Sequence, residues 1–188
     1  MTGIADLLFE ARQLKELPRS GYTFLGAGKE SVAEHSFLVT FIAMVMAELT
    51  PEADALRLIR MCLVHDLPEA RTGDMNYVQR EYVTVDEDRA VADLAESLPF
   101  GRMFAPLLDE FNGADTLEAR LARDADQLSF LLDLKALSDI GYRPPEKWIP
   151  QITGRLLTPL GRQMAGEILA TEQDSWWLKK ILTQKQKI

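Results

Sequence analysis

The amino-acid sequence predicts an all-α fold, a single-domain helical bundle. Apolar residues recur every three or four positions in nearly every segment, which is the spacing of an amphipathic helix. No segment alternates apolar and polar residues as a half-buried strand does, and the sequence has no internal repeat. The 188 residues suffice for one domain, because a chain of this size buries roughly 70% of its unfolded surface.

Prolines and glycines divide the chain into helices and connections. A loop with one proline and three glycines is expected over 18–30, a turn at 72–74 and a proline-rich crossover over 141–151. The expected helices span 4–16, 32–49, 51–66, 78–97, 100–112 and 116–140, with one or two more between 152 and 185. We expect one domain over 1–188, with its core at about 10–140 and the C-terminal helices packed on that core.

Local signals indicate where several of these helices begin and end. Ser31 and Glu34 form an S-x-x-E capping box, and the residues after them are apolar on almost every face, which indicates a buried central helix. Pro51 is expected to open the next helix, and Pro68 to end it, because proline disfavours helical geometry in the residue before it. Gly141 is expected to cap the C-terminus of the long helix that precedes it.

Charge and composition narrow the possible partners and locations. The 21 basic and 29 acidic side chains give a net charge of −8, which argues against a nucleic-acid polymer, since such binding depends on neutralising phosphates. The longest apolar stretch without a charge, at about 36–47, is well short of the ~20 residues that span a bilayer, and the N-terminus lacks a signal pattern. We therefore expect no membrane partner. One cysteine cannot form an internal disulfide, so we expect a reducing, cytoplasmic location.

Four ionisable residues fall where the helical pattern predicts a core. His35 lies on the buried stripe of the central helix, His65 and Asp66 end the next helix, and Asp126 lies on an apolar stripe of the long helix. Two imidazoles and two carboxylates on facing helices would form a metal site suited to Mn, Fe, Co, Ni or Zn. Taken singly, each residue also has an ordinary interpretation, such as a hydrogen-bonded core histidine or an ion-paired aspartate.

Four segments of the chain together carry a family resemblance. The most specific is HDLPEARTGDM, over 65–75, and the others are LKELPRSGY over 14–22, ESVAEHS over 30–36 and RDADQLSF over 123–130. These segments resemble the motifs of the HD-domain metal-dependent phosphohydrolases, and more closely those of their 5′-deoxynucleotidase-like branch. The resemblance runs from about residue 10 to about residue 135, and it implies a helical bundle of the HD-domain type.

The resemblance implies a site for one divalent metal ion. His35, His65 and Asp66 would be ligands and Asp126 the fourth, with Asp124 as the alternative to Asp126. The ion would be Mn, Co, Fe, Ni or Zn, and Mg is also possible. A second ion is not expected, because dinuclear members of the superfamily need further histidines and this chain has only two.

The same resemblance implies roles for residues around the metal. Glu69 would be a general acid or base, Asp74 would handle substrate or water, and Arg19 would bind the substrate phosphate, which suits a guanidinium fork. The chain reads RSGY over 19–22, whereas deoxy-selective members carry tryptophan directly after the arginine. This departure leaves a preference for deoxyribonucleotides open.

The expected activity is the hydrolysis of nucleoside 5′-monophosphates to a nucleoside and inorganic phosphate by metal-activated water. Two alternatives stay open: a hydrolase of another small phosphate ester or of a nucleoside triphosphate, and a non-catalytic nucleotide-sensing module. A homodimer is expected from the resemblance and from Trp176 and Trp177, which would pack on the core or on a second copy.

Overall fold

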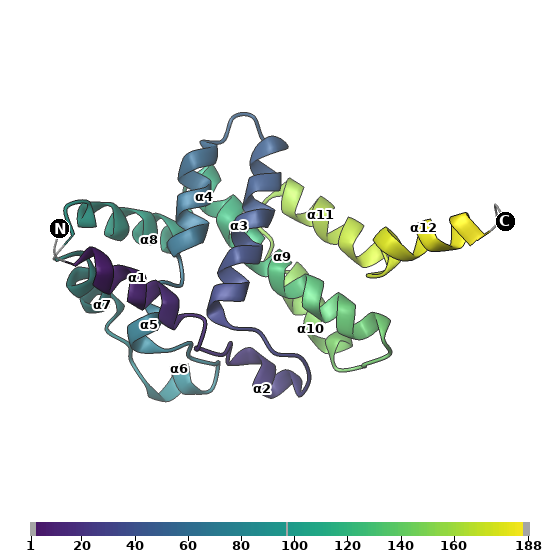
Figure 1. Cartoon of the computed structure of the whole chain (residues 1–188), viewed down its shortest axis with the longest axis horizontal. Coiled ribbons are helices and arrows are strands. Elements are labelled where there is room, and N and C mark those ends of the chain that lie inside the picture. The colour runs from purple at the N-terminus through teal and green to yellow at the C-terminus, as the bar shows by residue number, and fades with distance from the viewer. Residues whose placement is uncertain (1–2, 97, 186–188) are drawn as a thin grey trace.

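The computed structural model describes residues 3–96 and 98–185, and every regular element in these ranges is a helix (Figure 1). The prediction of an all-α fold is therefore confirmed. The first half holds α1 (Ile4–Gln13), α2 (Gly21–Leu25), α3 (Val32–Glu48), α4 (Ala55–Val64), α5 (Glu69–Thr72), α6 (Gln79–Tyr82) and α7 (Glu87–Ala95). The second half holds the 3₁₀ helix η1 (Gly101–Met103), α8 (Phe104–Gly113), α9 (Leu117–Asp139), α10 (Pro145–Thr153), α11 (Pro159–Ala170) and α12 (Ser175–Lys185).

Helices α3, α4 and α9 form the centre of the molecule and pack against one another (Figure 1). The main core cluster takes Val39 and Met46 from α3, Met61 from α4, and Leu128 and Leu131 from α9, all of them fully buried. Because α3 is apolar on several faces, α4 and α9 can both cover it. Of the residues of the candidate metal site, His35 lies on α3 and Asp126 on α9, while His65 and Asp66 directly follow α4.

The start of α3 confirms the predicted capping box, whereas the start of α4 differs from the prediction. The Ser31 hydroxyl accepts a hydrogen bond from the Glu34 amide, and the Glu34 carboxylate accepts one from the Ser31 amide, at 3.2 and 2.7 Å. Helix α4 begins at Ala55 rather than at Pro51. The Asp54 carboxylate caps it by accepting from the Arg57 amide at 3.0 Å, so the helix begins after this aspartate and not after the proline.

The helix predicted over 78–97 is wrong, since the chain forms two shorter helices there. The segment 83–86, which contains a Val-Thr-Val run, lies between α6 and α7 and is not helical. Branched side chains lose rotamer freedom in a helix, and Asp86 provides a competing start signal by accepting from the Arg89 amide at 3.1 Å.

Two connections predicted from glycine and proline contain short helices. The loop expected over 18–30 includes α2, and the crossover expected over 141–151 includes most of α10, which begins at Pro145. Proline is compatible with the first turn of a helix, so a proline pair can start one as well as interrupt one. Gly141 confirms its predicted role, because it follows the last residues of α9 with φ +86°, a conformation that suits glycine.

Among the C-terminal helices, α11 packs closely on α9. The Asp124 carboxylate, fully buried on α9, accepts hydrogen bonds from the amides of Leu157 and Thr158 at 2.6 and 2.8 Å and from the Thr158 hydroxyl at 2.6 Å. A Cβ atom on Gly161 would lie 2.2 Å from this carboxylate, so glycine is needed at this point of α11. Helix α12 extends away from the body of the molecule (Figure 1). Among the described helices, none combines the length and the apolar character needed to cross a membrane.

Candidate metal centre

Three helices bring His35, His65 and Asp126 together. His35 lies in the first turns of α3, His65 follows the last residue of α4, and Asp126 lies in the first half of α9. One possible ligand atom from each residue lies within 4.8 Å of the others. The Nε2 atom of His35 is 3.0 Å from an oxygen of Asp126, and the two imidazole ring centroids are 5.5 Å apart.

Asp66 lies beside this group of three. Its Oδ2 atom is 3.2 Å from Nε2 of His65 and 3.6 Å from Nε2 of His35. The same oxygen is 3.4 Å from the guanidinium of Arg19. Asp66 is therefore close enough to the two imidazoles to serve as a fourth ligand, and it also links them to the predicted substrate arginine.

The hydrogen bonds of the two imidazoles leave their Nε2 atoms facing this cluster. Nδ1 of His65 lies 2.8 Å from the Cys62 carbonyl oxygen, which can only accept, so Nδ1 donates to it and Nε2 is the nitrogen that can give up its proton to bind a metal ion. Nδ1 of His35 lies 3.3 Å from the Ser129 hydroxyl and 3.7 Å from the Glu30 carboxylate. Metal-binding histidines use their second nitrogen in this way, because the contact sets the tautomer and the ring orientation.

A divalent metal ion fits these residues. Within the described chain, the buried Nε2 atoms of His35 and His65 lack a hydrogen-bond partner, although carboxylate oxygens lie nearby. Buried polar atoms normally have such a partner, so two unpaired nitrogens that face two carboxylates form a donor set suited to a cation. Two nitrogen and two oxygen donors suit a first-row transition metal better than a soft thiolate-binding ion.

The charges of the cluster are consistent with cation binding. Burial lowers the pKa of His35, although Asp126 opposes this effect. For His65 burial acts in the same direction, but the neighbouring Asp66 carboxylate outweighs it and raises the pKa to about 9. Burial alone would raise the pKa values of Asp66 and Asp126, yet the imidazoles and Arg19 hold both below their usual range. Both carboxylates are therefore ionised at neutral pH, as metal ligands must be.

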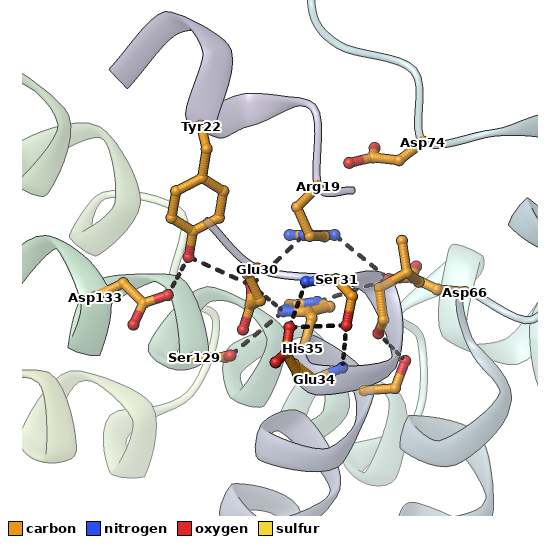
Figure 2. Close-up of polar contacts among 12 residues, drawn as sticks. Arg19, Tyr22, Glu30, Ser31, Glu34, His35, Asp66, Asp74, Ser129 and Asp133 are labelled. Carbon is orange, nitrogen blue, oxygen red and sulfur yellow. Dashed lines mark hydrogen bonds and ion pairs between the residues drawn. The ribbon is translucent and has the colours of Figure 1, made fainter. Parts of the chain in front are cut away.

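Arg19 enters the site from the loop before α2 (Figure 2). Its guanidinium lies 3.4 Å from the Asp66 carboxylate and 3.9 Å from the Glu30 carboxylate, and its side chain is 20% exposed. Burial would lower the pKa of Arg19, but the surrounding carboxylates, Asp66 first, raise it. A cation at the rim of a carboxylate-rich site can bind a phosphate that the carboxylates alone would repel.

Glu69 is the first residue of α5, and Asp74 follows the end of this helix. The Glu69 carboxylate has a buried oxygen, Oε2, without a hydrogen-bond partner in the described chain, and burial, assisted by Asp66 and Asp74, raises its pKa to about 9. Asp74 follows Gly73, whose φ of +78° suits glycine. The Asp74 carboxylate accepts a hydrogen bond from the Ser20 amide at 2.7 Å, so it holds the loop that carries Arg19 (Figure 2).

Asp124 and Asp126, two residues apart on α9, face different partners. The Asp124 carboxylate is bonded to Leu157 and Thr158, while that of Asp126 faces His35. Helical residues two positions apart point about 200° from each other, so only one of this pair can face the histidines. The geometry favours Asp126 as the α9 ligand.

Sequence reasoning did not assign roles to three polar residues next to the site. Glu30 and Ser129 contact His35, and Asp133 accepts a hydrogen bond from the Tyr22 hydroxyl. Asp133 lies seven positions after Asp126, about two helical turns along the same face of α9, and this spacing is a usable signal. No comparable spacing identifies Glu30, since it reaches His35 from the loop before α3.

Comparisons with known proteins identify the family of this chain. The family model described as HD domain covers residues 11–167. The human protein named 5′-deoxynucleotidase HDDC2 is 27% identical over 138 residues, covering 70% of this chain and 67% of that protein. The mouse protein of the same name is 26% identical over 181 residues, covering 92% and 89%. A crystal structure of a protein from Pyrococcus horikoshii OT3 aligns with a TM-score of 0.72 and 29% identity, over 89% of this chain and 99% of that chain. Because the family model spans most of the sequence, including all the candidate site residues, the chain belongs to the HD domain family.

Proposed function

We propose that this protein is a metal-dependent phosphohydrolase that releases inorganic phosphate from nucleoside 5′-monophosphates. The observation that carries the proposal is the convergence of buried His35, His65 and Asp126 beside Asp66 and Arg19. The relatives named 5′-deoxynucleotidase support a nucleotide as the substrate.

His35, His65, Asp66 and Asp126 would hold one divalent ion, with Mn, Co, Fe, Ni or Zn as candidates and Mg possible. When bound, the ion would supply Lewis-acid chemistry at a phosphoryl oxygen and at the attacking water. Arg19 binds the remaining phosphate oxygens and offsets the negative charge of the surrounding carboxylates. Glu69 donates a proton to the leaving 5′-oxygen through its Oε2 atom, which has no hydrogen-bond partner in the described chain. Asp74 would handle substrate or water, and it also keeps the Arg19 loop in place.

A second candidate substrate is a different or larger phosphate ester, such as a nucleoside triphosphate. Tyr22 is buried and its hydroxyl points to Asp133 and Glu30. A Cβ atom on Gly21 would meet nothing within 4 Å. The space next to the phosphate-binding arginine is therefore open enough for more than one kind of ester.

Phosphate release after metal exchange tests the proposal. Protein stripped with chelator is reconstituted separately with Mn²⁺, Co²⁺, Ni²⁺, Zn²⁺ and Mg²⁺, and each form is given ribo- and deoxyribonucleoside 5′-monophosphates, 3′-monophosphates and triphosphates. We expect release from 5′-monophosphates with at least one transition metal, none from the stripped protein, and none from Asp66→Ala.

The same assay separates the alternatives. Release only from triphosphates would replace the monophosphate assignment with the larger ester. Bound metal with no release from any of these substrates would overturn the hydrolase assignment and favour a nucleotide-sensing module. The ratio of deoxy to ribo substrates measures what the small residues after Arg19 contribute to sugar preference.

We propose that the protein forms a homodimer through an exposed apolar stripe on α3. Phe37, Phe41 and Met44 follow one another at helical spacing and are exposed by 70%, 50% and 43%. Trp176 and Trp177 are exposed by 75% and 43%, so they do not pack into the core of their own chain and their place in a dimer interface stays a prediction. Contiguous exposed apolar surface of this kind is typical of protein interfaces.

Light scattering at micromolar concentration tests the dimer. We expect Phe37→Glu to weaken association about tenfold or more, because a charge would be buried in the interface. Phe9→Glu on α1 is the matched control, since Phe9 is equally exposed at 69% and lies on another helix. A monomeric wild type, or equal association of both variants, would contradict an interface on α3.

We further propose that residues 1–188 work as one domain in the cytoplasm. Helices α10 and α11 pack on α9, which supports a single unit. The one cysteine, Cys62, is buried and without a disulfide, as is common in a reducing compartment.

A further inference from the structure

We propose that Glu30 is a positioning residue that acts on both the substrate arginine and the metal ligand His35, and that Tyr22 supports it. The inference rests on the proposed function for the roles of Arg19 and His35. The contacts that support it are made by one carboxylate oxygen of Glu30, at the point where the loop before α3 meets that helix (Figure 2).

The Oε2 atom of Glu30 faces three side chains at once. It lies 3.7 Å from Nδ1 of His35, 3.9 Å from Nε of Arg19, and it accepts a hydrogen bond from the Tyr22 hydroxyl at 3.4 Å. The Glu30 side chain is 9% exposed. A carboxylate this buried is retained at low cost only where cations or donors surround it, and here these are the groups that the site uses.

The backbone also ties Glu30 to Arg19. The Arg19 amide donates to the Glu30 carbonyl oxygen at 2.9 Å, which closes the loop between the two residues. Tyr22 lies inside this loop, packs edge-to-face on Phe130 and hydrogen-bonds to Asp133 on α9. Gly28 has a φ of +79°, and a Cβ atom there would lie 3.0 Å from the Tyr22 ring, so the loop needs glycine to close over the tyrosine.

These contacts define what Glu30 does. Its carboxylate faces the outer nitrogen of His35 beside the Ser129 hydroxyl, so the two groups together orient the imidazole whose inner nitrogen points to the metal cluster. The same carboxylate faces the inner nitrogen of Arg19, which leaves the terminal nitrogens of the guanidinium directed to Asp66 and the phosphate position. One carboxylate therefore aligns the metal side and the phosphate side of the site.

Two binding constants, neither of which depends on turnover, test the inference. The affinity of stripped protein for Mn²⁺ and the affinity of Mn²⁺-loaded protein for inorganic phosphate are measured by calorimetry. We expect Glu30→Gln to weaken both affinities by about tenfold. Mutation of a residue that contacts a metal ligand typically lowers the affinity of the site for the metal by about 10- to 100-fold. Tyr22→Phe, which removes the supporting hydroxyl together with its hydrogen bond to Asp133, should weaken both by a smaller factor, and Glu30→Asp should partly restore them.

The control is Glu52→Gln, because Glu52 is exposed and distant in sequence from the site residues. Unchanged binding constants in Glu30→Gln would overturn the inference, even if the variant melted at a lower temperature. A change in only one constant would assign Glu30 to one partner and overturn the dual role. If wild-type protein binds Mn²⁺ but hydrolyses no nucleotide, the proposed function fails while these constants still decide the role of Glu30.

Discussion

Asp126→Asn is expected to lower metal-dependent phosphate release by at least about a thousandfold, because it removes a proposed metal ligand while keeping the shape of the side chain. An Asp126 oxygen lies 3.0 Å from Nε2 of His35, in the group that also includes His65. The amide carries no charge, and its NH₂ group cannot bind a cation. Steady-state phosphate release and Mn²⁺ titration of the stripped variant would both register the loss.

Asp109→Asn is the matched control for this experiment, since it makes the same chemical change at an exposed aspartate on α8. We expect it to retain wild-type activity and Mn²⁺ affinity. If Asp126→Asn also retained both, the ligand from α9 would have to be another residue. Circular dichroism of the variant at the assay temperature separates loss of the ligand from loss of the fold.

Asp124→Ala is expected to produce the largest loss of stability. Its buried carboxylate accepts three hydrogen bonds from Leu157 and Thr158, and alanine would leave these donors without their partner. Each buried donor left unpaired costs ~1–3 kcal/mol, so the free energy of unfolding should fall by about 3 kcal/mol or more. For a chain of this size that corresponds to a melting temperature lower by about 6–12 °C, measurable by calorimetry.

Metal affinity distinguishes the two neighbouring aspartates. At a temperature where Asp124→Ala is fully folded, we expect it to bind Mn²⁺ as the wild type does, because the Asp124 carboxylate faces the C-terminal segment. Asp109→Ala serves as the control for stability. An Asp124→Ala variant that melted at the wild-type temperature but bound Mn²⁺ poorly would reverse the assignments of the two residues.

Much of the fold could be predicted because its signals are local. The capping box at Ser31 and Glu34, the apolar central helix and the left-handed glycine at 141 depend on neighbouring residues alone. The break at 83–86 is not evident from the sequence, because the segment keeps a helical periodicity despite its branched side chains. The start of α10 at Pro145 is not evident either, because proline can interrupt a helix as well as start one.

The candidate site was predictable as a set of residues but not as an arrangement. Buried histidines and aspartates at helical spacing, together with the family resemblance, select His35, His65, Asp66 and Asp126. The choice between Asp124 and Asp126 depends on which face of α9 meets α3, and that is a property of packing. Glu30 contacts the site from a loop, so no sequence spacing establishes its place, whereas the seven-residue spacing of Asp133 from Asp126 puts it on the same face of α9.

The convergence of α3, α4 and α9 on one small cluster has a consequence for the lifetime of the protein in a cell. A divalent ion held by His35, His65 and Asp126 would cross-link segments that are far apart in the unfolded chain. An ion that binds only the native state adds about 2.7 kcal/mol of stability when its free concentration is a hundred times its dissociation constant. The supply of metal would then set the fraction of unfolded chains open to proteases, so metal-starved cells would hold less of this protein as well as a less active form of it.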